Sequence, residues 1–209
     1  MHRYIISDLH FGHLNILTYE PIRLKATCIY MKEKLKLTKT LEELIEEYNT
    51  ADIEVRKKFI KMHDELLINN WNKVVKSEDQ VFILGDFTLS RSKESIKNLV
   101  DRLNGNKVLI MGNHDTRKPK DYITLGFTNA IRKEIYIDDG VVAMHEPEAI
   151  SSKYINKDTV YLFGHVHGKL CQADTLSNFE CVCVERLNLT PIDLDQLIIK
   201  IRKRISNWA

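Results

Sequence analysis

Carboxylate, imidazole and amide side chains recur along this chain in short groups, and all three types can bind metal ions. Oxygen and nitrogen ligands without a thiolate suit a catalytic metal site better than a structural zinc site, which favours cysteine. Two metal ions about 3.5–4 Å apart can hold both the attacking and the leaving oxygen of an in-line displacement, and they lower the pKa of a bound water. The groups are Asp8 with His10, Asp86, Asn113–His114–Asp115, His145, and His165 with His167.

Each of these groups comes at or just after the C-terminal end of a short apolar run. Runs rich in Val, Ile and Leu with little alternation predict strands that are buried on both faces. Because ligands of open α/β sheets gather at the carboxyl edge of the strands, such strands would bring residues from the whole chain together. The predicted strands are Tyr4–Ile6, Val81–Leu84, Lys107–Met111, Val141–Met144, Val160–Phe163 and Phe179–Val184.

Each group alone also has a structural explanation. Asp86 could be a turn aspartate, and His145 could be a core histidine with satisfied hydrogen bonds. His165 and His167 are more specific, because residues i and i+2 point the same way on an extended chain. A structural explanation for all of them together fails, since burying so many unpaired carboxylates and imidazoles would cost several kcal/mol each.

The elements between the strands predict a layered α/β fold with helices outside the sheet. Apolar residues at helical spacing predict helices over Arg56–Val75 and Glu94–Leu103, and a last helix that Asp193 caps. Ile131–Ile137 alternates as a single strand would, and Asp138, Asp139 and Gly140 after it predict a hairpin turn.

The length of 209 residues suits one domain over 1–209. One stretch differs in composition, because Lys25–Val55 is dense in charge and predicts an inserted pair of helices. This insertion at about 25–55 is either a solvated appendage or a lid over the site.

Composition excludes some classes of protein and partner. With a net charge of +2, the chain lacks the basic excess that a long nucleic-acid track would need, although a local basic patch remains open. Its four cysteines form no Cys-x-x-Cys pair and are expected to be buried thiols. The N-terminus lacks the apolar core of a signal peptide, and no run approaches the ~20 apolar residues of a membrane span. We therefore expect a cytoplasmic protein with no membrane partner.

The order of the motifs resembles that of the calcineurin-like metallophosphoesterases. They read SDLH (Ser7–His10), GD (Gly85, Asp86), GNHD (Gly112–Asp115), a lone His145 and GHVH (Gly164–His167). The longer forms SDLHFGHLNI and LGDF are similar to short phosphoesterases common in bacteria and their phages. The resemblance implies a four-layer α/β/β/α sandwich of two mixed sheets.

The resemblance also implies roles for the site residues. Asp86 and a hydroxide that attacks phosphorus would bridge two metal ions, with Mn as the leading candidate and Fe, Zn, Co or Ni as others. His114 would protonate the leaving alkoxide or stabilise the phosphorane, and Asp115 would orient His114 by accepting its other ring N–H. The first metal would be held by Asp8, His10 and His167, and the second by Asn113, His145 and His165.

Four further residues are candidates for substrate contact. His13 and Asn15 could reach a phosphate oxygen or could cap the loop, Arg23 could clamp an anion or lie on the surface, and His63 could belong to the site or to the fold. The expected function is a phosphodiesterase on a small or nucleotide-like substrate. The alternatives are a phosphomonoesterase, a nuclease on single strands or ends, and a non-catalytic metal-binding scaffold for protein interaction.

Overall fold

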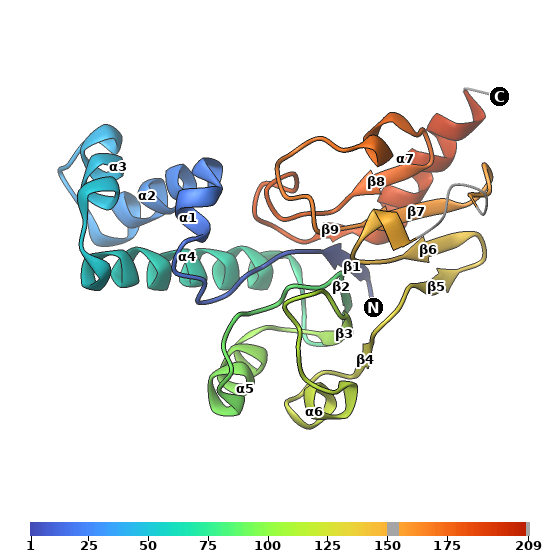
Figure 1. Ribbon diagram of the computed structural model, residues 1–209, viewed down its shortest axis with the longest axis horizontal. Coiled ribbons are helices and arrows are strands. Elements are labelled where there is room, and N and C mark those ends of the chain that lie inside the picture. The colour runs from blue at the N-terminus through green and yellow to red at the C-terminus, as the bar shows by residue number, and fades with distance from the viewer. Residues whose placement is uncertain (150–154, 208–209) are drawn as a thin grey trace.

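The computed structural model describes residues 1–149 and 155–207, and its strands form two mixed sheets (Figure 1). The first sheet has the order β4-β3-β2-β1-β9 and the second the order β5-β6-β7-β8. Neighbouring strands are parallel except for β9 against β1 and β5 against β6. The bounds are β1 Arg3–Ile6, β2 Gln80–Ile83, β3 Asn106–Ile110, β4 Asn129–Ile131, β5 Ile135–Asp138, β6 Val141–Ala143, β7 Val160–Phe163, β8 Phe179–Cys181 and β9 Ile192–Asp193.

Helices and sheets bury both faces of the central strands. Ile5 of β1 packs between the sheets with residues of β6, β7 and α7 (Leu194–Ser206), whereas Ile6 packs on the other face. That other face is covered by α4 (Ile53–Val74), α5 (Lys93–Arg102) and α6 (Pro119–Thr124). The outer side of the second sheet packs against a 3₁₀ helix, η3 (Gln172–Thr175), and a second one, η1 (Pro147–Ala149), follows β6. The predicted sandwich of two mixed sheets with helices is confirmed.

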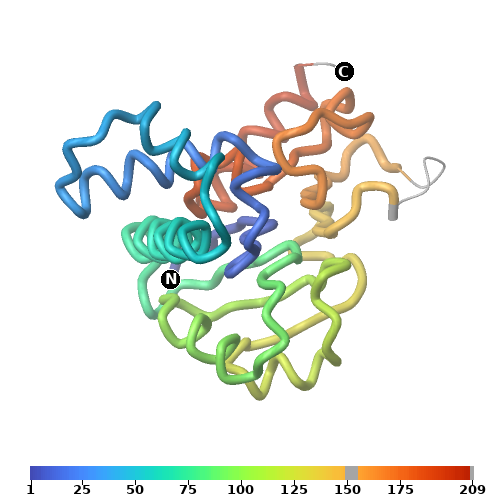
Figure 2. Tube along the Cα trace, turned by 60° about the vertical axis from the view of Figure 1, so that its left-hand side comes forward, coloured from blue at the N-terminus to red at the C-terminus, as the bar shows by residue number. Residues whose placement is uncertain are grey.

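A helical arm (residues 16–50) projects from the sandwich beside the first part of α4 (Figures 1 and 2). It consists of α1 (Ile16–Tyr19), α2 (Pro21–Leu35) and α3 (Leu41–Thr50). Thr40 and Glu43 form a reciprocal capping box at the start of α3, and Asp52 caps α4. The arm has an apolar cluster of its own with α4, which joins it firmly to the body.

One predicted element was wrong. Ile131–Ile137 is not a single strand, because β4 ends at Ile131 in the first sheet and β5 begins at Ile135 in the second. The intervening Arg132, Lys133 and Glu134 are charged, so this segment crosses between the sheets without entering either core. The hairpin turn after β5 is confirmed by its antiparallel pairing with β6.

The two sheets meet where β1 and β8 end. Cys183 forms a parallel bridge with Ser7, and the Val184 amide donates to the Ser7 carbonyl at 3.0 Å. The carboxyl edges of both sheets therefore lie together. None of the helices in the described part of the chain is both long and apolar enough to cross a membrane.

Candidate metal centre

All seven expected metal ligands lie at this joined carboxyl edge. The loops that carry them are tied to one another through the backbone: the Asp8 amide donates to the Gly85 carbonyl at 3.1 Å and the His10 amide to the Asp86 carbonyl at 2.9 Å. The Gly164 amide donates to the His145 carbonyl at 2.9 Å. Residues up to 159 positions apart in the chain are thus held close together, as the strand ends predict.

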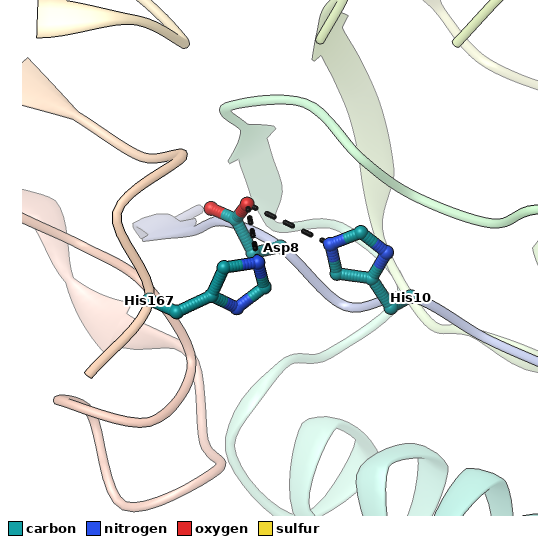
Figure 3. Close-up of side chains that lie close together, drawn as sticks. All are labelled: Asp8, His10 and His167. Atoms are coloured by element: carbon teal, nitrogen blue, oxygen red, sulfur yellow. Dashed lines mark ion pairs between the residues drawn. The ribbon is translucent and has the colours of Figure 1, made fainter. Parts of the chain in front are cut away.

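The first half of the centre consists of Asp8, His10 and His167 (Figure 3). The Nε2 atoms of both histidines lie 3.8 Å from Asp8 Oδ1, and the two rings are stacked with centroids 5.0 Å apart. Asp8 is fully buried, and its other oxygen accepts from the His165 amide at 2.9 Å and from the Cys183 thiol at 3.3 Å. One carboxylate oxygen is therefore fixed by the fold, while the other faces the two imidazoles.

Asp86 lies between the two halves. Its Oδ2 is 3.5 Å from His10 Nε2 in the first half and 3.6 Å from His145 Nε2 in the second. Its Oδ1 accepts from the His114 amide at 2.9 Å, which fixes the carboxylate. This is the position that a carboxylate shared by two ions would need.

The second half brings His145, Asn113 and His165 together. His145 donates its Nδ1–H to the Leu84 carbonyl at 2.7 Å, so its Nε2 carries the lone pair. That Nε2 lies 3.0 Å from Asn113 Oδ1 and 3.2 Å from His165 Nδ1. Three atoms that can bind a metal thus converge on one point.

The buried polar atoms of the centre fit metal ions. Within the described chain, Asp8 Oδ1 and both ring nitrogens of His10 are buried without a hydrogen-bond partner. Burial lowers the pKa of His10 far below its ordinary value, so the ring is neutral and offers a lone pair. Unpartnered buried groups of this kind cost about 1–3 kcal/mol each, and a cation removes that cost.

The backbone is strained where the ligands sit. Asp8, His10, Asp86, His165 and His167 all have positive φ, between 51° and 72°. Such a conformation costs roughly 1–3 kcal/mol for a residue with a side chain and persists where the surroundings determine it. The histidines of GHVH are therefore not on an extended chain, contrary to the prediction. Their rings instead serve different halves of the centre.

Two glycines allow this close approach. A Cβ at Gly85, where φ is +89°, would lie 2.5 Å from His145 Nδ1. A Cβ at Gly164 would lie 2.7 Å from Asp8 Oδ2. Any side chain at these positions would push a ligand away, which gives the glycines of GD and GHVH a packing role.

Asp115 is placed differently from the expectation. Its carboxylate accepts backbone N–H groups of Asp86 at 2.8 Å, Gly112 at 2.9 Å and Phe87 at 3.3 Å, and it is not hydrogen-bonded to the His114 ring. Burial raises the pKa of Asp115 to about 7. The carboxylate therefore ties two ligand loops together, because three amide donors surround it. The His114 side chain is 43% exposed, with Nε2 3.9 Å from Asp86 Oδ2.

Of the expected substrate residues, His13 and Asn15 are at least partly exposed. His13 is half-buried with its ring 5.4 Å from that of His10. Asn15 is exposed at the start of α1 and makes no capping hydrogen bond through its side chain, so the capping alternative is wrong for it. The His13 ring is close enough to the first half to be tested as a substrate contact.

Arg23 and His63 are instead fully buried. Arg23 therefore has neither expected role, because its guanidinium is committed to Glu185 and to backbone carbonyls rather than to solvent or an anion. His63 lies on the buried side of α4, with its Nδ1 3.4 Å from Asp64 Oδ1. The Asp64 carboxylate in turn accepts the Gly12 amide. Arg23 and Asp64 thus contact the loop that carries Asp8 and His10, whereas both ring nitrogens of His63 are buried without a hydrogen-bond partner among the residues that the structure describes.

Glu185 was missed in the sequence. It is buried and accepts the His167 Nδ1–H at 2.9 Å and the Arg23 Nε–H at 2.7 Å. Its signal was present, because Glu185 directly follows the apolar run Phe179–Val184, just as other site residues follow their strands.

The chain is similar to known proteins in sequence and in fold. Residues 1–147 match the family described as calcineurin-like phosphoesterase. The chain is 30% identical over 207 residues to an uncharacterised protein of Methanocaldococcus jannaschii, covering 96% of this chain and 91% of that protein. It is 39% identical over 62 residues to the gene 66 protein of Mycobacterium phage L5, covering 29% of this chain and 30% of that protein. A crystal structure of a protein of unknown function from Aquifex aeolicus has a similar fold, with a TM-score of 0.62, 24% identity, and 96% of this chain and 98% of that chain covered.

Proposed function

The chain belongs to the calcineurin-like phosphoesterase family, and from that premise we propose that it hydrolyses a phosphodiester of a small or nucleotide-like substrate with two metal ions. The observation that carries the proposal is the group of buried, unpartnered ligand atoms of Asp8 and His10 beside the shared carboxylate of Asp86. When bound, the metal ions supply a lowered pKa for water and stabilise charge on the phosphate oxygens.

The distances support one assignment of ligands. We propose Mn²⁺ as the metal because carboxylate, imidazole and amide ligands suit it. Asp86 would contact both ions, because its Oδ2 lies within 3.6 Å of a histidine nitrogen from each half. The first ion would be held by Asp8, His10 and His167, and the second by Asn113, His145 and His165.

We assign the proton donor to His114. Hydrolysis forms a bond from a water oxygen to phosphorus and breaks the bond to the leaving oxygen, which must then take a proton. His114 is the exposed histidine beside Asp86, so its ring can meet a substrate at the rim of the centre. Proton donation from its Nε2 would contribute about 10²–10⁴ in rate.

The positions of two arginines near the motifs support a diester over a monoester. A monoester carries one more anionic oxygen and needs more cationic contacts. Arg23, which donates to the Asp8 and Leu9 carbonyls of the DLH motif, is turned inward and bonded to Glu185. Arg117, after the GNHD loop, donates to the Arg91 carbonyl. The net charge of +2 likewise favours a small substrate over a nucleic acid.

The test is hydrolysis of bis(4-nitrophenyl) phosphate and of 4-nitrophenyl phosphate by the wild-type chain with Mn²⁺. Two variants accompany it, Asp86→Asn and His114→Ala. We expect faster turnover of the diester, and loss of turnover and of bound Mn²⁺ in Asp86→Asn. In His114→Ala we expect Mn²⁺ still bound and a fall in kcat that is larger for an alkyl ester than for the nitrophenyl esters, because nitrophenolate leaves without a proton.

Other outcomes decide between the alternatives. Faster turnover of the monoester would replace the diester assignment, and cleavage of short oligonucleotides that falls steeply with salt would point to a nuclease. Two bound Mn²⁺ ions with no turnover of any of these esters would contradict the catalytic proposal and favour a scaffold.

A further inference from the structure

A buried ion pair, Arg23 with Glu185, lies directly behind the first half of the centre. The Arg23 side chain is 0% exposed and that of Glu185 1%, and the guanidinium donates its Nε–H to Glu185 at 2.7 Å. The partners come from α2 in the helical arm and from the residues after β8, 162 positions apart. Burying such a pair costs desolvation energy, so the pair is not explained by a gain in stability alone.

Glu185 determines which nitrogen of His167 faces the metal position. A carboxylate only accepts hydrogen bonds, so His167 Nδ1, at 2.9 Å from Glu185, must carry the proton. The lone pair is then on Nε2, which lies 3.8 Å from Asp8 Oδ1. Carboxylates that hold a metal-binding histidine in this way fix its ring and raise its basicity.

Arg23 contacts the backbone of the DLH motif in the same half of the centre. Its Nη1 donates to the Leu9 carbonyl at 3.0 Å and its Nη2 to the Asp8 carbonyl at 2.5 Å. These carbonyls flank the strained positions of the DLH motif, since both Asp8 and His10 have positive φ. One pair of side chains therefore connects the backbone of the first motif to the ring of the last.

A separate cation at this place is the competing explanation. The ligand atoms of Glu20, His167 and Glu185 lie within 4.8 Å of one another. A neutral imidazole, however, has one lone pair, and His167 directs it towards Asp8. The Nδ1 atom that faces Glu185 carries a proton and cannot bind an ion there.

We propose that Glu185 and Arg23 are positioning residues of the first metal site, which orient His167 and hold the Asp8–Leu9 backbone so that this site binds its ion tightly. The inference rests on the proposed role of His167 as a ligand. It predicts that removing the pair weakens the first site and leaves the second unchanged.

The experiment measures binding of Mn²⁺ to the metal-free chain from the electron paramagnetic resonance signal of free Mn²⁺. The first site is isolated in a His165→Ala background and the second in a His10→Ala background. The main variant is Arg23→Met with Glu185→Met, because replacing both partners of a buried ion pair with apolar side chains is often neutral for folding. Glu185→Gln is the second variant, since its amide oxygen can still accept from His167. Asp79→Asn is the matched control, a buried carboxylate before β2 at the opposite end of the sheet.

The double variant is expected to lose about 10–100-fold in Mn²⁺ affinity at the first site only. Glu185→Gln is expected to lose less, and Asp79→Asn to lose nothing at either site. ¹⁵N spectra of the His167 ring should show the Nδ1–H tautomer in wild type and Glu185→Gln, and a mixture in the double variant.

Three results would overturn the inference. Wild-type affinity at the first site of the double variant would show that the pair only supports folding. Equal losses at both sites would show that its effect is not local. Three Mn²⁺ ions per wild-type chain, with the third lost in Glu185→Gln, would replace it with a cation site. A wild-type chain that binds no Mn²⁺ would instead overturn the proposed function itself.

Discussion

Each half of the metal centre has behind it a buried carboxylate that is not among the proposed ligands, and the two carboxylates have different partners. Asp115, behind the second half, accepts three backbone N–H groups. Glu185, behind the first half, accepts from two side chains, His167 and Arg23. Burial raises the pKa of Asp115 to about 7. Burial also acts to raise the pKa of Glu185, but the hydrogen bond from His167 and the charge of Arg23 outweigh it and lower that pKa.

The difference shows two ways in which a fold can position ligands. Asp115 acts on the backbone, since its donors are amides of the loops that carry Asp86 and Asn113. Because Asp86 lies between the two halves, a change at Asp115 should affect both of them. Glu185 acts on one ligand ring, so a change there should stay in one half. Substitutions that separate these two patterns test the comparison.

The largest effect is expected for Asp115→Ala. The substitution leaves three backbone N–H groups without an acceptor, and buried unsatisfied donors cost about 1–3 kcal/mol each. We therefore expect the metal-free chain to lose at least about 3 kcal/mol of unfolding free energy, measured by urea denaturation. Mn²⁺ binding should weaken in both halves. Asp115→Asn, which keeps one carbonyl oxygen, should fall between it and wild type.

An Asp115→Ala variant as stable as wild type, with both sites intact, would contradict the view that Asp115 positions the ligand loops. That view would fail in a different way if only His114 were affected, seen as a loss of turnover with normal Mn²⁺ binding. That result would restore the expected role of Asp115 as the partner of the His114 ring.

A smaller effect is expected where the two histidines of GHVH are compared. His167→Ala removes a donor from the buried Glu185, so the metal-free chain should lose about 1–3 kcal/mol of unfolding free energy. His165 is exposed, and His165→Ala should cost less than about 1 kcal/mol. The two variants remove the same ring two positions apart, so each is the control for the other. Equal stabilities in urea would contradict the view that Glu185 holds His167.

The same contrast explains what could be predicted from the sequence. Asp115 lies within the GNHD motif, two residues from a ligand, so local spacing pointed to it even though its partner was predicted wrongly. The partner was wrong because residue spacing does not show which amides surround a carboxylate. The strand ends predicted that the seven expected ligands would lie together, and the structure brings them to one edge, since parallel strands place their carboxyl ends side by side.

The contact between Glu185 and Arg23 could not be predicted from the sequence, although the position of Glu185 after an apolar run pointed to that residue. Their pairing joins the helical arm to the end of β8, and no local pattern encodes a contact across 162 residues. The sequence of α2 does not show whether Arg23 faces the protein interior or the solvent. Its direction depends on how the arm packs on the body. The split of Ile131–Ile137 has the same origin, because its alternation is compatible with one sheet or with two.

The smallest effect is expected for the hydrogen bond from Cys183 to Asp8, measured as Mn²⁺ affinity at the first site. The Cys183 thiol donates to Asp8 Oδ2 at 3.3 Å, whereas the equally buried Cys28 lies in the apolar cluster of the arm. Cys183→Ala and Cys28→Ala remove the same volume, so their difference isolates the hydrogen bond to Asp8. A thiol is a weak donor, and a net contribution of about 0.5–1 kcal/mol corresponds to a loss of about two- to fivefold in Mn²⁺ affinity at the first site. Cys28→Ala should leave both sites unchanged. If both variants bound Mn²⁺ equally, Asp8 would be held by the His165 amide alone, and the control of the first half would lie entirely with Arg23 and Glu185.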